Sequence, residues 1–343
     1  MRGLSADALT DAEAAALFGA HLPEVPAPVL LAVSGGPDST ALMGLYVAAR
    51  QRAPLPEAIV VTVDHGLRPE AREEAARVAA RAHQLGLKHR LLTWAGDKPA
   101  TGIQDAARQA RYGLIGACAA ATGARAVMTA HTLDDQAETV LMRLTRGSGL
   151  HGLGGMEPLS QRPGYWLVRP LLTIAKTRLL ATCAARGWEY ERDPSNLNRD
   201  FARVRLRQLM PLLAAEGLDA ARIAVFARRM RSAGEALEMA ARKALTEAVC
   251  VRGARHGYDA ARLAGEPDEV VVGIVRLLIE ARRAESGGLA PLKLNRIEAL
   301  AARLLAAQRA GVPFAATLGG VRFALRQNLL TCLGESPRRS GGG

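Results

Sequence analysis

The stretch that decides the fold runs from Pro28 to Tyr46 and reads PVLLAVSGGPDSTALMGLY. Its first part, VLLAV at 29–33, is a short apolar run typical of a buried strand, and its last part has the apolar spacing of a helix. Between them lies the loop SGGPDS at 34–39, in which two glycines stand where a strand turns directly into a helix. Such a turn offers unhindered backbone N–H groups and a helix N-terminus, which together attract a phosphate group.

The chemistry of this loop follows from the residues it has and from one that it lacks. No Gly-Lys-Ser/Thr follows the glycines, which excludes a Walker A loop, the type that cleaves between the β- and γ-phosphates of a nucleotide. Gly35 and Gly36 leave the backbone open, while the hydroxyls of Ser34 and Ser39 can donate to phosphate oxygens. We expect Asp38 to orient Mg²⁺ or a phosphate-bound water; the alternative, compatible with this role, is a carboxylate that caps the following helix.

A second glycine-rich stretch, GSGLHG at 147–152, matches the dinucleotide-binding pattern G-x-G-x-x-G. It follows a helical segment and not a strand, so the structural setting that this pattern requires is absent. We therefore do not expect a dinucleotide site there.

Short aliphatic runs alternate with longer segments of helical spacing from residue 28 to about residue 172. This alternation is typical of a parallel sheet with helices on both faces, so we expect a doubly wound, mostly parallel α/β domain over residues 28–211. The expected strands lie at 29–33, 58–63, 89–94, 124–130 and 165–171. Ligands of such sheets lie outside the carboxyl ends of the strands, so the loops that begin at Ser34, Asp64 and His131 should converge.

Asp64 and His65 end the second expected strand and His131 ends the fourth, so these side chains should border a nucleotide pocket. A histidine in such a place can transfer a proton or act as a fixed hydrogen-bonding group, and we favour the second role. The chain has no H-E-x-x-H motif and no compact set of metal-ligating residues, so we expect any metal to be Mg²⁺ that arrives with the nucleotide.

The character of the sequence changes after Pro211, where alanine-, leucine- and arginine-rich segments with a 3.6-residue period begin. We expect a second, mainly helical domain over residues 212–335. It should end in a small β element, a hairpin at 314–333 that turns at Gly319-Gly320. The expected helices of this domain lie at 218–248, 268–284 and 293–310.

Length and composition indicate a globular protein of two domains, because the chain has 343 residues, of which 49% are hydrophobic and 23% are charged. Outside these domains we expect an N-terminal helical segment at 1–27 and a disordered tail at 336–343. The net charge of +12 indicates a polyanionic partner such as nucleic acid, although an arginine-rich proteome would give the same charge.

Four cysteines, Cys118, Cys183, Cys250 and Cys332, are spread over the chain without a C-x-x-C pair. This spacing argues against zinc, an iron–sulfur cluster or disulfide exchange, and it is typical of buried thiols in a reducing cytoplasm. We find neither a basic leader before an apolar run nor the roughly 20 apolar residues that a membrane span needs. We therefore expect a cytoplasmic protein without a signal peptide or a membrane anchor.

Four further stretches, together with SGGPDS, carry a resemblance to a known family. They are VDHGLRPEAREEA at 63–75, AARQARY at 106–112, TAHTLDDQAETVLMRLTRGSGLHGLGGM at 129–156, and RPLL at 169–172 with WEYERDPSN at 188–196. In this order and spacing they resemble tRNA(Ile)-lysidine synthetase, a family of the ATP pyrophosphatase or PP-loop superfamily. The resemblance covers residues 28–210, and DDQAETVLMRLTRGSG is its most specific block.

The resemblance implies an ATP-dependent ligase that forms a C–N bond in two steps. O2 of the wobble cytidine in an isoleucine tRNA with a CAU anticodon attacks the α-phosphorus of ATP and expels pyrophosphate. The ε-amine of free lysine then displaces AMP from C2, and the product is lysidine. The resemblance thus implies ATP and Mg²⁺ as cofactors and tRNA and L-lysine as partners.

The helix that contains Asp135 and Glu138 should present both carboxylates on one side, away from its apolar stripe. Two such carboxylates can accept hydrogen bonds from an amino group such as N4 of cytosine. The residues alone also allow a solvated helix face with ion pairs to Arg143 or Arg111. The resemblance favours the first interpretation and implies that Arg111, Asp135 and Glu138 hold the target base. We prefer Arg111 over Arg108 for this role.

Arginines near the end of the first domain and in the second domain are candidate RNA contacts. The first group alternates with apolar residues and can form a phosphate-contacting strip or a solvated edge, and we favour RNA contact. Val204 within it stands where the family usually has asparagine. The arginines of the second group either contact tRNA or are solvated surface residues without a specific partner. The candidates are Arg203, Arg205 and Arg207 in the first group and Arg228, Arg229 and Arg231 in the second.

Three other functions compete with this interpretation. A tRNA thiolation enzyme uses the same loop to adenylate a base and then delivers sulphur, but such enzymes generally need cysteines that this chain lacks. A small-molecule ligase linked to an amidotransferase would leave the basic charge unexplained. A non-enzymatic RNA-binding module with a decayed pocket would tolerate loss of the loop glycines, and both are present.

Overall fold

The computed structural model describes residues 7–20, 28–96, 98–99, 101–191, 202–252, 255–286 and 292–334. The chain divides into two compact units. The first comprises Met1–Thr145 and Gly155–Phe226, and the second comprises Arg146–Gly154 and Ala227–Gly343. The expected disordered tail at 336–343 and the DPSN part of the family motif at 193–196 lie outside the described residues.

The first unit is built on a six-stranded sheet with the strand order β3-β2-β1-β4-β6-β5. Neighbouring strands are parallel except at the edge, where β5 runs antiparallel to β6. The strands are β1 Val29–Ala32, β2 Ala58–Asp64, β3 Lys88–Thr93, β4 Ala126–Thr129, β5 Leu159–Arg162 and β6 Tyr165–Val168. The expected doubly wound, mostly parallel fold is confirmed.

The edge strand β5 was not predicted from the sequence. Its residues read LSQR and are mostly exposed, so they carry no apolar run that would indicate a strand. The strand forms because a two-residue turn, Pro163-Gly164, brings it beside β6, and Gly164 adopts a φ of +85° in that turn.

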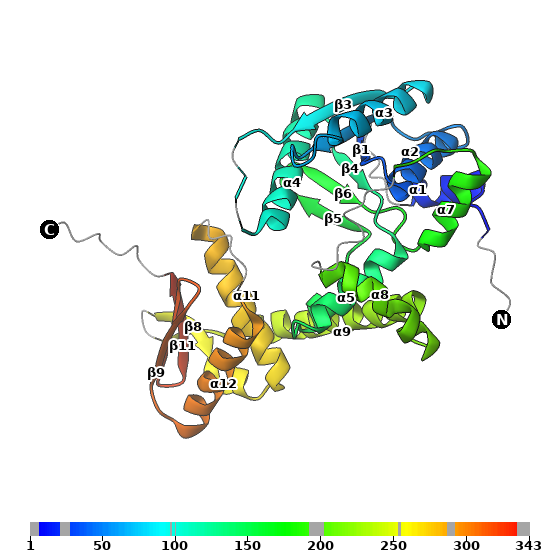
Figure 1. The fold of residues 1–343 in the computed structure, drawn as a ribbon. Helices are drawn as coiled ribbons and strands as arrows, with labels where there is room; N and C mark the ends of the chain where they lie inside the picture. The colour runs from blue at the N-terminus through cyan, green and yellow to red at the C-terminus, as the bar shows by residue number, and fades with distance from the viewer. Residues whose placement is uncertain are drawn as a thin grey trace. The chain divides into compact units, whose positions relative to one another are not determined.

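Helices cover both faces of this sheet (Figure 1). Successive side chains of β1 point to opposite faces, so Leu31 packs in one apolar cluster with Leu42 of α2, while Leu30 packs in another with Ile115 of α4. The helices of this unit are α1 Asp11–Gly19, α2 Pro37–Arg50, α3 Ala71–Gln84, α4 Ile103–Thr122, α5 Leu133–Leu144, α7 Lys176–Ala185 and α8 Ala202–Ala215, followed by the start of α9 Ala220–Glu247.

The N-terminal helix α1 belongs to the first unit. Thr10 and Glu13 form a capping box at its start, in which each side chain bonds the other residue's backbone N–H. The ring of Phe18 packs edge-on against Tyr46 of α2, with 5.1 Å between the ring centroids. Residues 11–19 are therefore helical, as expected for the N-terminal segment.

The second unit combines helices with a five-stranded antiparallel sheet of order β7-β8-β11-β10-β9. One apolar cluster joins α11 and α12 to β10 and β11. Its strands are β7 Val249–Arg252, β8 Arg255–Asp259, β9 Phe314–Leu318, β10 Val321–Arg326 and β11 Leu329–Gly334. Its helices are α6 Leu150–Leu153, most of α9, α10 Ala260–Ala264, α11 Asp268–Ser286 and α12 Leu294–Ala310.

The expected hairpin at 314–333 is a three-stranded meander. The turn at Gly319-Gly320 occurs as predicted, with both glycines at positive φ. A second turn follows at Gln327-Asn328, where φ is +49° and +65°. This turn was not predicted from the sequence because no glycine marks it, although asparagine is one of the residues that tolerate the left-handed region.

The chain passes between the two units inside α9, after Phe226. The boundary expected at 211/212 falls inside α8, which continues through Pro211. Residues 146–154 belong to the second unit, so GSGLHG leads into the short helix α6 in that unit. None of the helices in the described ranges combines the length and the apolar character that crossing a membrane requires.

Two helical glycines of the first unit make a matched pair for a stability test. A Cβ atom at Gly44 of α2 would overlap the indole of Trp188, whose Cε2 atom would lie 2.7 Å away, whereas a Cβ at Gly113 of α4 would meet nothing within 4 Å. We expect Gly44→Ala to lower the free energy of unfolding by about 1–3 kcal/mol through overpacking. We expect Gly113→Ala to raise it by about 0.5–1 kcal/mol through better helix propensity.

Urea titration followed by tryptophan fluorescence measures this unit selectively, because all three tryptophans of the chain belong to it. Equal stability of Gly44→Ala and wild type would contradict the close packing of α2 against Trp188.

Candidate active site

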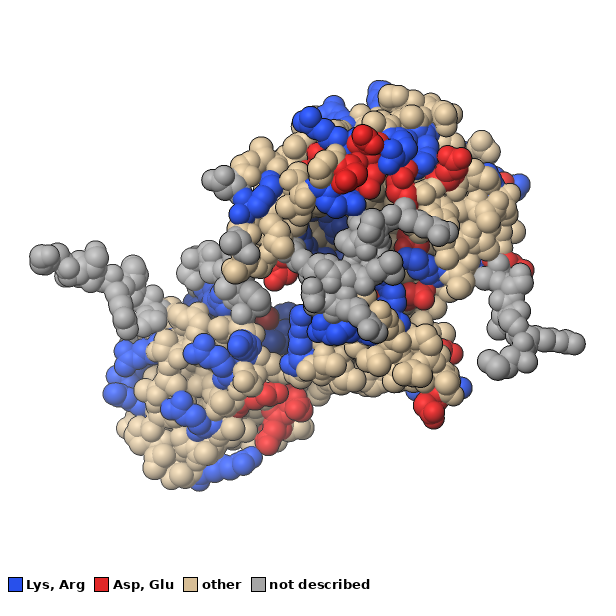
Figure 2. Space-filling view, viewed as in Figure 1, with Lys and Arg blue, Asp and Glu red and all other residues tan. Residues whose placement is uncertain are grey.

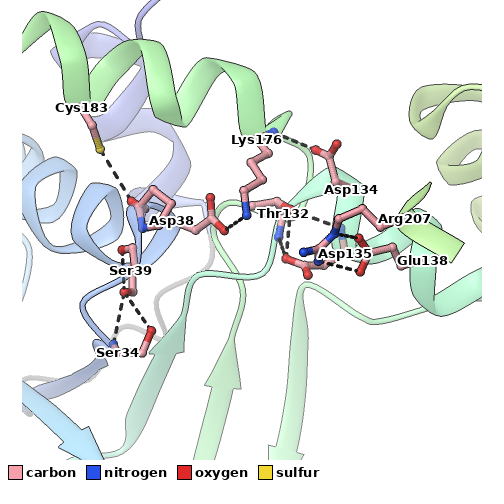
Figure 3. A network of polar contacts seen from close by, with 12 residues as sticks. Ser34, Asp38, Ser39, Thr132, Asp134, Asp135, Glu138, Lys176, Cys183 and Arg207 are labelled. Atoms are coloured by element: carbon pink, nitrogen blue, oxygen red, sulfur yellow. Dashed lines mark hydrogen bonds and ion pairs between the residues drawn. The ribbon is translucent and has the colours of Figure 1, made fainter. Parts of the chain in front are cut away.

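The phosphate loop joins β1 to α2, and Gly36 is the N-cap residue of that helix. Gly35 has a φ of +89°, a conformation that side-chain-bearing residues rarely adopt. Ser39 folds the loop: its hydroxyl donates to the Gly36 carbonyl at 3.0 Å and accepts from the Ser34 N–H at 3.2 Å (Figure 3). The Ser39 hydroxyl therefore joins the two ends of the loop.

The loop is also held from outside, through Gly35. The Glu191 N–H donates to the Gly35 carbonyl at 2.9 Å. A Cβ on Gly35 would lie 3.2 Å from Cγ of Glu191 and 3.2 Å from Cγ2 of Val78, so α3 and the segment after α7 both approach this residue.

Two arginines of α3 hold the Glu191 side chain in this position. Arg77 donates to both carboxylate oxygens, at 2.9 and 3.2 Å, and Arg81 donates at 3.1 Å. The hydrogen bond from Arg77 keeps the pKa of the Glu191 carboxyl below its ordinary value. The contact of Arg77 and Arg81 with Glu191 could not be predicted from the sequence, because the partners lie more than a hundred positions apart.

Asp38, at the start of α2, pairs with Lys176, the first residue of α7, at 3.0 Å between Oδ2 and Nζ (Figure 3). Burial raises the pKa of the Asp38 carboxyl, the Lys176 charge opposes this, and the nearby charges of Asp135 and Asp134 raise it further. Oδ1 of Asp38 is buried without a hydrogen-bond partner among the described residues. Asp38 therefore has an oxygen available for a ligand.

Lys176 and Asp134 were missed by the sequence analysis. Asp134 accepts the backbone N–H of Lys176 at 2.7 Å and so fixes the start of α7 beside α5. The only local signal for Lys176 is its position four residues after RPLL. Figure 3 shows Lys176 between the carboxylates of Asp38 and Asp134.

Asp135 forms a capping box with Thr132 at the start of α5. Its Oδ2 accepts from the Thr132 N–H at 2.9 Å and from the Thr132 hydroxyl at 3.0 Å. The pattern Thr-x-x-Asp at 132–135 could have indicated this structural role. Asp135 still lies near the site, since its charge raises the pKa of both Asp38 and His131.

Glu138 is buried, with only 2% of its side chain exposed. Arg207 donates to both of its oxygens, from Nε at 2.6 Å and from Nη2 at 3.1 Å, and Nε of Arg203 lies 3.2 Å from Oε2. Glu138 is therefore not on a solvated helix face. Arg203 and Arg207, which pair with it, come from α8, whereas the alternative had named Arg143 and Arg111.

The expected strip of three arginines does not form, because residues 203–207 are helical and not extended. Arg203 and Arg207 are one turn apart and both approach Glu138, while Arg205 is exposed. Val204, which stands in place of the family's asparagine, is buried. An RNA contact by these arginines remains a prediction.

The loops after β1, β2 and β4 lie side by side, because these strands are neighbours in the sheet. Asp64 accepts the Gly66 N–H at 2.8 Å and so shapes the end of β2. Burial lowers the pKa of His65, and the charge of Arg111 lowers it further. Nδ1 of His65 is buried without a hydrogen-bond partner in the described part of the chain.

His131 shares a hydrogen bond of 2.8 Å between its Nδ1 and the Thr129 hydroxyl. Burial is the main cause that lowers the pKa of His131 to about 3. The charges of Arg169 and Arg111 lower this pKa as well, whereas the charge of Asp135 raises it. The imidazole is thus neutral at neutral pH. This favours the hydrogen-bonding role over proton transfer.

Arg108, Arg111 and Arg162 surround the ring of Tyr112, with guanidinium carbons 5.1–5.4 Å from its centroid. Burial alone would raise the pKa of the Tyr112 hydroxyl, but the charges of Arg111 and Arg108 bring it below its ordinary value. Of these three arginines, only Arg111 also lowers the pKa of both His65 and His131 through its charge. This supports the preference for Arg111.

A family model of the PP-loop domain matches residues 11–213. Over nearly the whole chain, the tRNA(Ile)-lysidine synthase of Methylobacterium sp. (strain 4-46) is 52% identical across 315 residues, which cover 91% of this chain and 90% of that protein. The chain belongs to the tRNA(Ile)-lysidine synthase family.

Other comparisons agree with this membership. The tRNA(Ile)-lysidine synthase of Rhodopseudomonas palustris is 46% identical over 353 residues and aligns with 99% of both chains, so the lysidine synthase similarity extends beyond residues 28–210. Among solved structures, the U34-tRNA thiolase NcsA from Methanococcus maripaludis has a TM-score of 0.56 at 15% identity, over 65% of this chain and 78% of that one. This second likeness shows a shared fold.

Three of the four cysteines lack the features of reactive thiols. Cys118, Cys183 and Cys332 are buried, Cys250 is half-buried, and none forms a disulfide. Burial raises the pKa of the Cys118 thiol, and it raises that of Cys183 to about 11 and that of Cys332 to about 12. These three thiols therefore stay protonated at neutral pH, which disfavours a role for them in sulphur transfer.

The candidate arginines of the second unit lie on α9. Arg231 donates to the Gly154 carbonyl, within the same unit, whereas Arg228 and Arg229 are exposed. Figure 2 shows lysine and arginine side chains spread over the viewed face of this unit. Arg228 and Arg229 are therefore more accessible to RNA than Arg231.

We expect Glu191→Ala to weaken ATP binding about tenfold, because the variant loses the side chain that α3 uses to hold Gly35. Isothermal titration of ATP in the absence of RNA measures this directly. Glu73→Ala is the matched control, since Glu73 also lies near Arg77, at 3.9 Å, but is not among the residues that approach Gly35. If both variants bind ATP equally well, the Glu191 contact does not position the loop.

Proposed function

We propose that this chain uses ATP to activate O2 of the wobble cytidine in an isoleucine tRNA with a CAU anticodon, and then joins the ε-amine of free lysine to C2. The products are lysidine, AMP and pyrophosphate. The observation that carries the proposal is the identity of about half of all residues with tRNA(Ile)-lysidine synthases over nine-tenths of the chain. The residue roles below are supported by the geometry of the first unit.

In the first step a bond forms between cytidine O2 and the α-phosphorus, and the bond from that phosphorus to the departing pyrophosphate breaks. The N–H groups of the loop at 34–39 and the hydroxyls of Ser34 and Ser39 would hold the pyrophosphate. Lys176 is close enough to Asp38 for its charge to stabilise a phosphate beside the start of α2. These groups make pyrophosphate a better leaving group.

Mg²⁺ fits the donor set at Asp38. Its Oδ1 is a buried carboxylate oxygen without a partner among the described residues, and hard oxygen donors are what Mg²⁺ prefers. No three His, Cys, Asp or Glu side chains within the described ranges form a metal site by themselves. Asp38 would therefore hold the ion together with phosphate oxygens, and the ion would neutralise charge on the triphosphate.

In the second step the ε-ammonium group of lysine first gives one proton to solvent, the neutral nitrogen then bonds to C2, the bond from C2 to O2 breaks, and AMP leaves with that oxygen. Arg111, Asp135 and Glu138 would hold the base, with a carboxylate accepting from its N4 amino group. The wobble base is already unpaired in an anticodon loop, which lowers the cost of presenting it to a pocket. Neutral His131 and His65 would contribute hydrogen bonds.

The RNA partner and the compartment are parts of the same proposal. The net charge of +12 and the exposed Arg205, Arg228 and Arg229 support binding to a polyanion. Four unpaired thiols are consistent with a reducing cytoplasm.

The test is to incubate the protein with ATP, labelled lysine and an isoleucine tRNA of CAU anticodon. We expect one lysine to be attached per AMP and per pyrophosphate formed, and no AMP release when the tRNA is omitted. RNA-dependent pyrophosphate release without lysine incorporation would overturn the proposal in favour of another nucleophile. Serine at all four cysteine positions should leave the reaction intact, and specific loss of activity would favour sulphur chemistry.

Asp38→Asn keeps the size of the side chain and removes its charge. We expect pyrophosphate release to fall by a factor of about 10²–10³, the usual effect of removing one electrostatic contact at a reacting phosphate. Asp11→Asn, which alters a paired carboxylate of α1, is the control and should retain the wild-type rate. Normal release by Asp38→Asn would remove Asp38 from the phosphate site.

A further inference from the structure

The carboxylate proposed to receive the target base is already occupied within the protein. Both oxygens of Glu138 accept hydrogen bonds from Arg207 (Figure 3). Arg203 adds a second positive charge, 3.2 Å from Oε2 of Glu138. Only 2% of the Glu138 side chain is exposed, so an incoming amino group cannot reach it without displacing a partner. In the structure as it stands, Glu138 cannot serve as an acceptor for the base.

The two arginines belong to a helix that is weakly anchored. Val204 is the one buried residue of α8, while Leu209 and Leu212 of the same helix are 47% and 67% exposed. A helix with so small an apolar contact depends on its polar contacts for its position. The ion pairs from Arg203 and Arg207 to α5 are therefore a main part of what holds the start of α8.

More than one cation is held at Glu138. The hydrogen bond to Glu138 raises the pKa of Arg207, and the charges of Asp135 and Asp38 also act on Arg207 and raise its pKa further. Two guanidinium groups face one carboxylate, and a further bond from Arg203 goes to the neutral hydroxyl of Thr139, at 3.1 Å. Guanidinium groups bind phosphate in the same two-pronged geometry that they use for a carboxylate. An RNA phosphate could therefore take the place of Glu138 at these arginines without a change in the type of bond.

We propose that Glu138 and the Arg203/Arg207 pair form a latch that RNA opens. The arginines transfer from Glu138 to phosphate groups of the incoming anticodon loop, and the released carboxylate accepts the amino group of the target base. The inference rests on the proposed function and adds to it the step that makes the base pocket accessible.

The exchange also links RNA binding to the identity of the base. A buried carboxylate without a partner is strongly unfavourable, so opening the latch is favourable only if a donor replaces Arg207 at Glu138. The N4 amino group of cytosine is such a donor, whereas uracil presents a carbonyl oxygen at that position. The latch therefore opens fully for a cytosine and not for a uracil.

The test uses the full chain and measures binding alone. The probe is an anticodon stem–loop RNA with an abasic wobble nucleotide, so that no base contacts residue 138. We expect Glu138→Gln to bind this RNA about five- to tenfold more tightly than wild type, because the arginines no longer have to leave a carboxylate. The slope of log affinity against log salt should become steeper by one to two phosphate contacts, about 0.7–0.9 each.

A double variant and a charge-matched control separate the latch from a general gain in positive charge. The gain in affinity should disappear in Glu138→Gln/Arg207→Gln. Glu13→Gln changes the net charge equally and frees Arg178 from a 2.9 Å ion pair elsewhere in the unit, and it should leave the affinity unchanged. Its capping box persists, because glutamine can take the place of glutamate there.

Arg207→Lys gives a second test that does not alter Glu138. Lysine keeps the charge but cannot make the two-pronged contact with either a carboxylate or a phosphate, so it weakens the closed latch and the RNA contact together, and the affinity for RNA should change less than in Glu138→Gln. Unchanged or weaker binding by Glu138→Gln, an equal gain in Glu13→Gln, or a gain in Arg207→Lys as large as that in Glu138→Gln would overturn the latch. Lysine incorporation by the wild type on intact tRNA is scored separately: if it occurs, such results reject the latch alone, and if it does not, the proposed function and the latch fall together.

Discussion

A carboxylate that is removed from water must be paired, and this constraint organises the catalytic end of the first unit. Asp38, Glu138 and Glu191 each lie at or beside the ends of the parallel strands, and each is bound by a cation from a distant part of the chain. The pairs join α2 to α7, α5 to α8, and α3 to the segment after α7. Because each pair crosses between elements, it fixes the position of a helix and of a functional side chain together.

The same pairs prepare the unit for a substrate that is itself an anion. A lysine or arginine that neutralises a carboxylate in the free protein can bind phosphate when a nucleotide or RNA arrives. Lys176 stands beside the phosphate loop and Arg207 beside the base pocket, so both could exchange partners during the reaction. We infer that these internal ion pairs hold the base pocket closed in the free protein, and that phosphate groups of the substrate then replace the carboxylates as partners of Lys176 and Arg207.

Much of the fold could be predicted because it depends on local pattern. The apolar run at 29–33 and the loop at 34–39 placed a strand, a turn and a helix correctly, since each depends on neighbouring residues. Strand β5 could not be predicted, because its polar residues pair only when the adjacent turn brings them to β6. At residues 203–207 the local pattern was misleading. The alternation of arginines with apolar residues indicated a phosphate-contacting strip, whereas the segment is helical.

The site was predicted less completely than the fold, for a physical reason. The phosphate loop is one continuous stretch, whereas the partners of its neighbours come from elsewhere: Lys176 lies 138 positions from Asp38, and Arg207 lies 69 positions from Glu138. No periodicity records such a pairing. The role of Asp135 as a capping residue was local and could have been inferred from Thr132.

In the proposed reaction the target cytidine gives up its O2 to AMP. The most direct test supplies tRNA in which O2 of the wobble cytidine carries oxygen-18, together with unlabelled ATP and lysine, and measures the mass of the released AMP. We expect each AMP formed to carry one oxygen-18 atom and the lysine-modified nucleoside to carry none. AMP without the label, or label retained in the modified RNA, would rule out this reaction.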